Sequence, residues 1–149
     1  MTDPIDPNRS LPASPPALAF PSAPLTWWRT LPPEFLDLTA QRHLRTALLA
    51  APTLRLPGWE AAIRADPAAA IGVAFTILAE GVARPGSIDR ALSAVLLCAA
   101  LGDAASRDLL VHVLGRRARR RADLDALRLA RRWRGWGHQE SSSVIAPGR

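Results

Sequence analysis

The chain has 149 residues, 48% of them hydrophobic, and a formal net charge of +6, which suits about one domain with a buried core. All its basic residues are arginine, and nine of them lie with only two aspartates between residues 115 and 134, a local charge of +7. The single cysteine, Cys98, excludes an internal disulfide and fits a reducing compartment. The N-terminus lacks the apolar core of a secretory signal, and no segment is long enough to span a bilayer, so we expect a cytoplasmic location.

Residues 1–30 are predicted to form a proline-rich, largely disordered arm, because proline removes backbone donors and disfavours helix before it. Half of the fourteen prolines lie before residue 27. Two tryptophans near the end of this arm, Trp27 and Trp28, have two interpretations. They pin the arm to the helical body, or they anchor a partner, since aromatic side chains are enriched at interface anchors. Trp27 and Trp28 are therefore a candidate partner-docking arm.

In the rest of the chain, the spacing of apolar residues and the capping residues predict helices at residues 34–51, 59–65, 67–82, 87–101, 103–115 and 122–133. Segment 87–101 is apolar nearly all round, which marks it as the central buried helix. Gly102 favours the left-handed position after this helix, and Asp103 is the expected N-cap of the next one. So short a link makes the two helices antiparallel neighbours. The residues expected to face the core outside the central helix are Phe35, Leu38, Leu44, Leu48, Ile71, Ala74, Phe75, Leu78, Val82, Leu109, Leu110, Val113, Leu114, Leu124, Leu127, Ala130 and Trp133.

These segments predict an all-α fold, either a small helical bundle or a short stack of antiparallel helical hairpins. About five to six helices occupy a domain at residues 31–137. We expect Gly115 and the arginines after it to loosen the end of the fifth helix, and Gly135 and Gly137 to end the sixth. Residues 138–149 are expected to form a flexible tail.

Asp66 and Asp103 lie 37 residues apart, and each precedes a predicted helix–turn–helix. This spacing is typical of an internal repeat of helical hairpins. Small residues recur where paired helices would approach each other. The stretch at about 74–115 resembles Sel1-like repeats, a branch of the tetratricopeptide class, and that resemblance implies a non-catalytic scaffold that binds proteins. The residues that carry it are Leu78, Gly81, Val82, Asp89, Ala91, Leu92, Ala99, Ala100, Gly102, Asp103, Ala104, Leu114 and Gly115.

The polar residues do not form a catalytic or metal-binding pattern. His43, His112 and His138 lie on separate elements, with no cysteine or carboxylate in metal-ligand spacing. Asp108, His112 and Arg116 are four residues apart, which predicts a solvated row of ion pairs on one helix face. The sequence also lacks a P-loop, a dinucleotide-binding glycine motif and a nucleophile elbow. We therefore expect no enzymatic activity, no metal, no cofactor and no small-molecule substrate.

The most strongly charged feature is the segment at residues 116–134, where guanidinium groups suit phosphates and carboxylates. Three partners fit it: an acidic protein surface, nucleic acid and an anionic membrane surface. We expect a non-enzymatic protein–protein interaction module, an adaptor or a small subunit of a larger assembly, whose groove between helices 67–82, 87–101 and 103–115 binds protein. The alternative is a nucleic-acid-binding protein that uses residues 116–134. The candidate partner-binding residues are Arg116, Arg117, Arg119, Arg120, Arg121, Arg128, Arg131, Arg132, Trp133 and Trp136.

Overall fold

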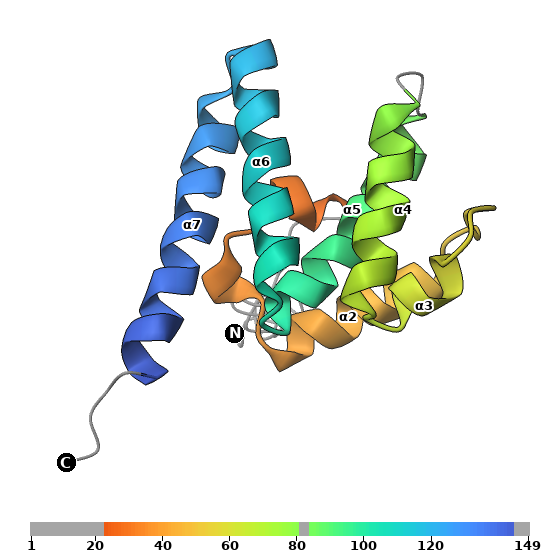
Figure 1. The fold of residues 1–149 in the computed structure, drawn as a ribbon, viewed down its shortest axis with the longest axis horizontal. Coiled ribbons are helices and arrows are strands. Elements are labelled where there is room, and N and C mark those ends of the chain that lie inside the picture. Colours follow the sequence, from red (N-terminus) through yellow and green to blue (C-terminus); the bar gives the residue numbers. More distant parts are fainter. Residues whose placement is uncertain (1–22, 81–83, 145–149) are drawn as a thin grey trace, which may run out of the picture.

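The computed structural model describes residues 23–80 and 84–144. Helices alone make up the regular structure of this part, and no strand occurs in it, so the predicted all-α bundle is confirmed (Figure 1). The predicted features at residues 1–22, 81–83 and 145–149 lie outside the described residues. In chain order the elements are η2 (Pro24–Arg29), η3 (Pro33–Phe35), α2 (Leu38–Ala50), α3 (Trp59–Ile63), α4 (Pro67–Ala79), α5 (Pro85–Ala100), α6 (Ala104–Arg121) and α7 (Leu124–Val144).

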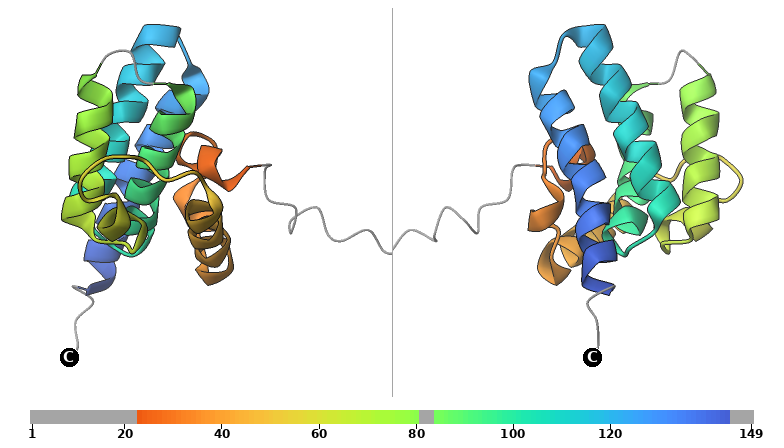
Figure 2. Two further views of the ribbon diagram at one scale, coloured as in Figure 1. Left: turned by 90° about the vertical axis from the view of Figure 1, so that its right-hand side faces the viewer. Right: turned by 60° about the vertical axis from the view of Figure 1, so that its left-hand side comes forward.

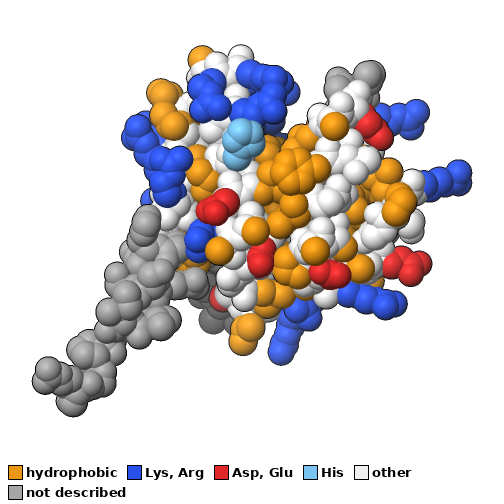
Figure 3. Space-filling view, in the orientation of Figure 1, with side chains coloured by type: hydrophobic (Ala, Val, Ile, Leu, Met, Phe, Trp, Pro, Cys, Tyr) orange, Lys and Arg blue, Asp and Glu red, His pale blue; other side chains and the backbone are white. Residues whose placement is uncertain are grey.

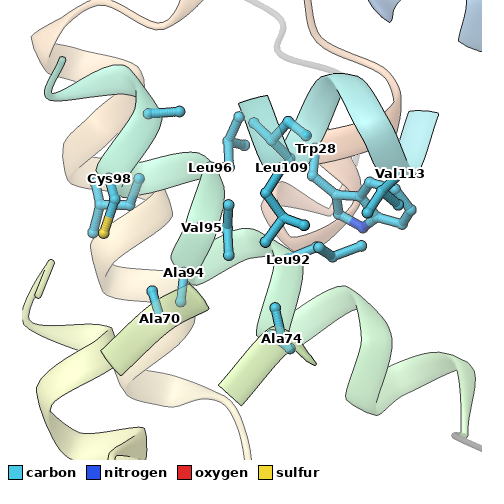
Figure 4. Close-up of a cluster of buried hydrophobic side chains, with 14 of the residues drawn as sticks. Trp28, Ala70, Ala74, Leu92, Ala94, Val95, Leu96, Cys98, Leu109 and Val113 are labelled. Carbon is cyan, nitrogen blue, oxygen red and sulfur yellow. The ribbon is translucent and has the colours of Figure 1, made fainter. Parts of the chain in front are cut away.

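Helix α5 is the centre of the fold, as its apolar sequence predicts. Every residue from 91 to 99 is buried, and α5 packs against η2, α2, α4 and α6. Ala70 and Ala74 of α4 and Ala94 of α5 are all fully buried (Figure 4), and such small side chains let two helices approach closely. The hydroxyl of Ser93, which is also buried, donates to the Leu25 carbonyl at 2.9 Å, so this polar group is satisfied inside the core.

The link between α5 and α6 has the predicted cap geometry. Gly102 has a φ of 103°, a left-handed conformation that costs glycine little. The Asp103 carboxylate accepts a hydrogen bond from the Ser106 backbone N–H at 2.8 Å and another from the Ser106 hydroxyl at 2.7 Å. This N-cap satisfies one of the donors left open at the start of α6, and the chain reverses direction at once.

Helices α6 and α7 are longer than predicted and lie side by side as an antiparallel hairpin (Figure 2). Gly115 does not loosen α6, which continues to Arg121, and α7 continues past Gly135 and Gly137 to Val144. A glycine inside a helix costs only about 1 kcal/mol. Packing between the two helices offsets that cost at Gly115, because the next turn of α6 buries Ala118.

Several residues predicted to face the core are exposed instead. Phe35 and Leu38 are exposed because the chain forms the short η3 before α2 begins, so the expected helical face is interrupted. Leu124, at the first position of α7, is exposed as well. Helix α4 buries Ala70, Val73, Ala74 and Ile77, and α7 buries Ala126, Leu129, Ala130 and Trp133. Phe75 of α4, which was predicted to face the core, is 58% exposed.

The two tryptophans of the predicted docking arm belong to the core. Trp27 is 1% exposed and Trp28 is 3% exposed. The indole N–H of Trp28 donates to Asp89 Oδ1 of α5 at 2.8 Å, and Arg29 Nε lies 3.4 Å from the same oxygen. η2 therefore packs as part of the helical body, although it lies within the predicted arm at residues 1–30. The interpretation in which Trp27 and Trp28 pin the arm to the helical body fits the structure, since their rings hold η2 on α5. The two rings do not form an exposed docking arm, although Trp28 also lines a pocket between α4 and α6.

Candidate functional site

The arginines of segment 116–134 are divided between two surfaces by the α6–α7 hairpin. One surface is a groove between α4 and α6, and the other is a hollow between η2 and α7. Arg117 lines both surfaces. Burial and the positive charges of Arg121 and Arg29 lower the pKa of the Arg117 guanidinium, while Asp123, whose carboxylate lies 3.6 Å away, opposes that shift.

The first surface, named here the α4–α6 groove, has an apolar floor and a volume of about 410 Å³. Trp28 and Val113, drawn side by side in Figure 4, contribute to this floor. Phe75 stands exposed on the α4 side. Figure 3 shows hydrophobic side chains gathered between α6 and α4, with arginines at the C-terminal end of α6. The lining residues are Trp28, Phe75, Leu78, Ala79, Ile88, Leu109, His112, Val113, Arg116, Arg117, Arg120 and Arg121.

The charge of the α4–α6 groove is entirely positive. Four arginines line it, and none of its lining residues is a carboxylate. Among the described residues, no carboxylate lies within ion-pair distance of Arg116, Arg120 or Arg121. Exposed guanidinium groups beside an apolar floor favour a ligand that combines acidic groups with an apolar face.

The second surface, named here the arginine hollow, has a volume of about 720 Å³. Its arginines are largely paired with carboxylates. Arg29 pairs with Asp89, Arg117 with Asp123, Arg128 with Asp125 at 3.4 Å and Arg132 with Glu34 at 2.7 Å. These carboxylates neutralise part of the positive charge, so the hollow attracts anions less strongly than the number of arginines suggests. The lining residues are Arg29, Thr30, Pro32, Arg117, Asp123, Asp125, Arg128, Leu129, Arg131 and Arg132.

The remaining predicted site residues separate into core and surface positions. Trp133 is 0% exposed, and its indole N–H has no hydrogen-bond partner among the described residues. This burial corrects its assignment as a partner-binding residue, because a buried ring offers no stacking face. Ala126, Leu129 and Ala130 of α7 are buried with Trp133 inside the fold. Trp136 is half-buried beside Glu34 and Arg132, and Arg119 is exposed outside both surfaces.

Phe75 is the site residue that sequence analysis assigned elsewhere, because its spacing places it with the predicted core face of α4. The signal that could have identified it is the excess of apolar residues in α4. Almost every position of this helix is apolar, so one neighbouring helix cannot cover them all. An apolar side chain left uncovered on such a helix is a candidate interface residue.

The described residues contain no group of three His, Cys, Asp or Glu side chains that could hold a metal ion. Asp108 approaches Arg107 at 3.9 Å, and His112 and Arg116 are exposed on α6.

Burial, with smaller contributions from Asp103 and Asp66, raises the pKa of the Cys98 thiol to about 11, so the reactive thiolate is suppressed at neutral pH. Within the described ranges, every helix is too short or too polar to cross a membrane.

Comparison with known family models, curated proteins and solved structures finds no match to this chain. The resemblance of residues 74–115 to Sel1-like repeats therefore stays a prediction.

Proposed function

We propose that this protein is a non-enzymatic protein-interaction module, an adaptor or a small subunit of a larger assembly. Its α4–α6 groove binds a segment of another protein that carries apolar side chains next to acidic ones. The observation that carries this proposal is Phe75, a large ring left 58% exposed in a groove whose charged lining is all arginine.

The energetics favour covering this groove. Burying an exposed phenylalanine contributes up to about 1.5–3 kcal/mol, and aromatic residues and arginine are the side chains enriched at interface hot spots. The arginines at the C-terminal end of α6 then attract acidic groups and raise the association rate. The apolar floor supplies affinity, and the arginines supply steering and selectivity.

The proposal is tested by selecting binders from a displayed library of short random peptides on the immobilised full-length chain. The affinity of selected peptides is then measured by fluorescence polarisation. Phe75→Glu is expected to weaken binding at least about tenfold, because it places a charge in the apolar contact. Leu49→Glu is the matched control. Leu49 is 68% exposed on α2, outside the groove, so affinity should change by less than about twofold.

Selected peptides that bind Phe75→Glu and the unaltered chain equally would contradict this proposal. So would a selection that yields no binder at all. Thermal unfolding of both glutamate variants provides the folding control, since neither substitution enters the core.

A second candidate function is nucleic-acid binding, and the observation that favours it is the arginine hollow. Five arginines line this hollow, and guanidinium groups bind phosphate oxygens well. Contacts from five to seven arginines would give a log–log salt slope of roughly −4 to −6. Ion pairs with carboxylates and the burial of Trp133 weigh against this candidate, since they remove free charge and a stacking ring.

The second candidate is tested with a fluorescent random oligonucleotide titrated across a salt series. A variant with Arg128, Arg131 and Arg132 changed to serine is compared with a control in which Arg55 and Arg64, exposed outside the hollow, are changed to serine. Steep salt dependence that is lost only in the first variant would support nucleic-acid binding. No binding at low salt, or equal loss in both variants, would exclude a specific role of the hollow.

A further inference from the structure

We propose that the α4–α6 groove takes an amphipathic helix of about three turns, with an acidic C-terminal end that lies against Arg116, Arg120 and Arg121. This inference rests on the proposed function and adds the conformation of the partner segment and the direction in which it binds.

The shape of the lining favours a helix. The groove lies between two helices, and the described residues contain no strand whose edge could pair with an extended peptide. The described residues therefore offer no sheet edge for strand addition, and a groove between two helices suits the helix-in-groove mode. Seven residues of α6 between Leu109 and Arg121 line the groove. They are spaced one, three or four positions apart, so they form one continuous stripe along the helix.

The length of this stripe sets the length of the partner. From Leu109 to Arg121 the rise of α6 is about 18 Å, at about 1.5 Å per residue. A partner helix of about twelve residues, or three turns, covers the same distance. Its apolar side chains would recur at i, i+3 or i+4, and i+7 to meet the floor near Phe75 and Val113.

The stripe has a direction, because its two ends differ in chemistry. Leu109 and Val113 are apolar, whereas the positions from Arg116 to Arg121 are cationic. Helices α4 and α6 run the same way, so the C-terminal end of α4 also lies at the cationic end of the groove (Figure 1). The groove therefore has an apolar end and a cationic end.

Electrostatics decides which end of the partner meets the arginines. A helix carries about −0.5 charge at its C-terminus and +0.5 at its N-terminus. The C-termini of α4 and α6 each contribute about −0.5 charge nearby. Arg116, Arg120 and Arg121, which have no carboxylate within ion-pair distance among the described residues, outweigh them with three positive charges. The C-terminal end of the partner, with acidic side chains on its last turn, is therefore the favoured neighbour.

The state of Arg117 is consistent with this direction. Its pKa is lowered by burial and by the positive charges of Arg121 and Arg29. Positive charge is thus crowded at the cationic end, and an incoming anionic helix terminus would relieve that repulsion.

The test uses two synthetic peptides with the same composition and the same apolar spacing, built from a sequence selected on the full-length chain. One peptide carries three glutamates in its last turn, and the other carries them in its first turn. We expect the peptide with C-terminal glutamates to bind about tenfold more tightly at low salt, and its helical circular dichroism to rise on binding. In the variant with Arg116 and Arg120 changed to serine, this preference should fall to about twofold or less.

Four outcomes overturn the inference. Equal affinity of the two peptides, or a preference for N-terminal glutamates, overturns the direction, and binding without a gain in helicity overturns the helical conformation. Displacement of the peptides by a random single-stranded oligonucleotide at comparable affinity assigns the groove to nucleic acid instead. If both peptides bind equally but lose affinity in Phe75→Glu, only the direction fails and the proposed function stands. If neither depends on Phe75, the proposed function fails too.

Discussion

Leucine at position 97 offers the sharpest test of the central role of α5. Leu97 is 0% exposed, so Leu97→Ala removes three buried carbon atoms, worth about 0.8 kcal/mol each or about 2.4 kcal/mol of transfer free energy. The cavity left behind adds to this cost, and we expect a total loss of about 3–4 kcal/mol in the free energy of unfolding. For a folded part of this size the midpoint of thermal unfolding should fall by roughly 10–15 °C.

Urea unfolding followed by far-ultraviolet circular dichroism and tryptophan fluorescence measures this loss. Leu101→Ala is the matched control, because Leu101 lies one helical turn later and is 49% exposed. Its cost should not exceed about 0.5 kcal/mol. A loss below about 1 kcal/mol in Leu97→Ala, or equal losses in the two variants, would refute the placement of α5 at the centre.

Three further predictions concern local features. Asp103→Ala should lower the free energy of unfolding by about 1 kcal/mol in urea titrations, because the N-cap of α6 is lost; an unchanged midpoint would contradict the cap. Ala122→Gly should raise the free energy of unfolding by about 0.5 kcal/mol and the melting temperature slightly, because alanine at φ 50° is strained and glycine is not. The greater entropy of glycine in the unfolded chain offsets part of this gain. A lower melting temperature would refute this prediction. Cys98 should react with a thiol reagent at pH 8 at least about 100-fold more slowly in the folded than in the urea-unfolded chain. Because its folded-state pKa of about 11 lies above the ordinary value of 9.0, its contribution to stability is present below pH 9 and is lost as pH rises towards 11.

The features that sequence analysis predicted correctly are those with local physical causes. Segment 87–101 is apolar on every side, and such a helix must be buried by its neighbours. Gly102 and Asp103 carry the turn and cap preferences of their own side chains, so the link between α5 and α6 could be predicted without tertiary information.

The faces of α4 and α7 could not be predicted in the same way. In α4 nearly every residue is apolar, so a stripe through Phe75 and Leu78 fits the helical period as well as one through Val73 and Ile77. In the structure the stripe with more small residues is the buried one, because small side chains let α4 pack closely against α5. Periodicity alone favours the larger side chains and therefore places Phe75 inside.

The charge of the candidate site was predicted, and the expected groove between helices 67–82, 87–101 and 103–115 lies where the α4–α6 groove is found. The exposure of Phe75 in this groove and the place of the arginines were not predicted. The concentration of arginine at residues 116–134 is evident from the sequence. Its division between the α4–α6 groove and the arginine hollow depends on where α4 and η2 pack, and both lie far away in the chain. Long-range contacts of this kind, such as the bond from Trp28 to Asp89, have no signal in local sequence.

The most direct test of the proposed function is to map where a selected acidic peptide binds, by amide chemical shifts of the isotopically labelled full-length chain. We expect the largest shifts on residues 72–79 of α4 and 109–121 of α6, and we expect them to disappear in Phe75→Glu. Shifts concentrated at residues 128–136 of α7, or shifts that persist in Phe75→Glu, would contradict the assignment of the α4–α6 groove as the binding site.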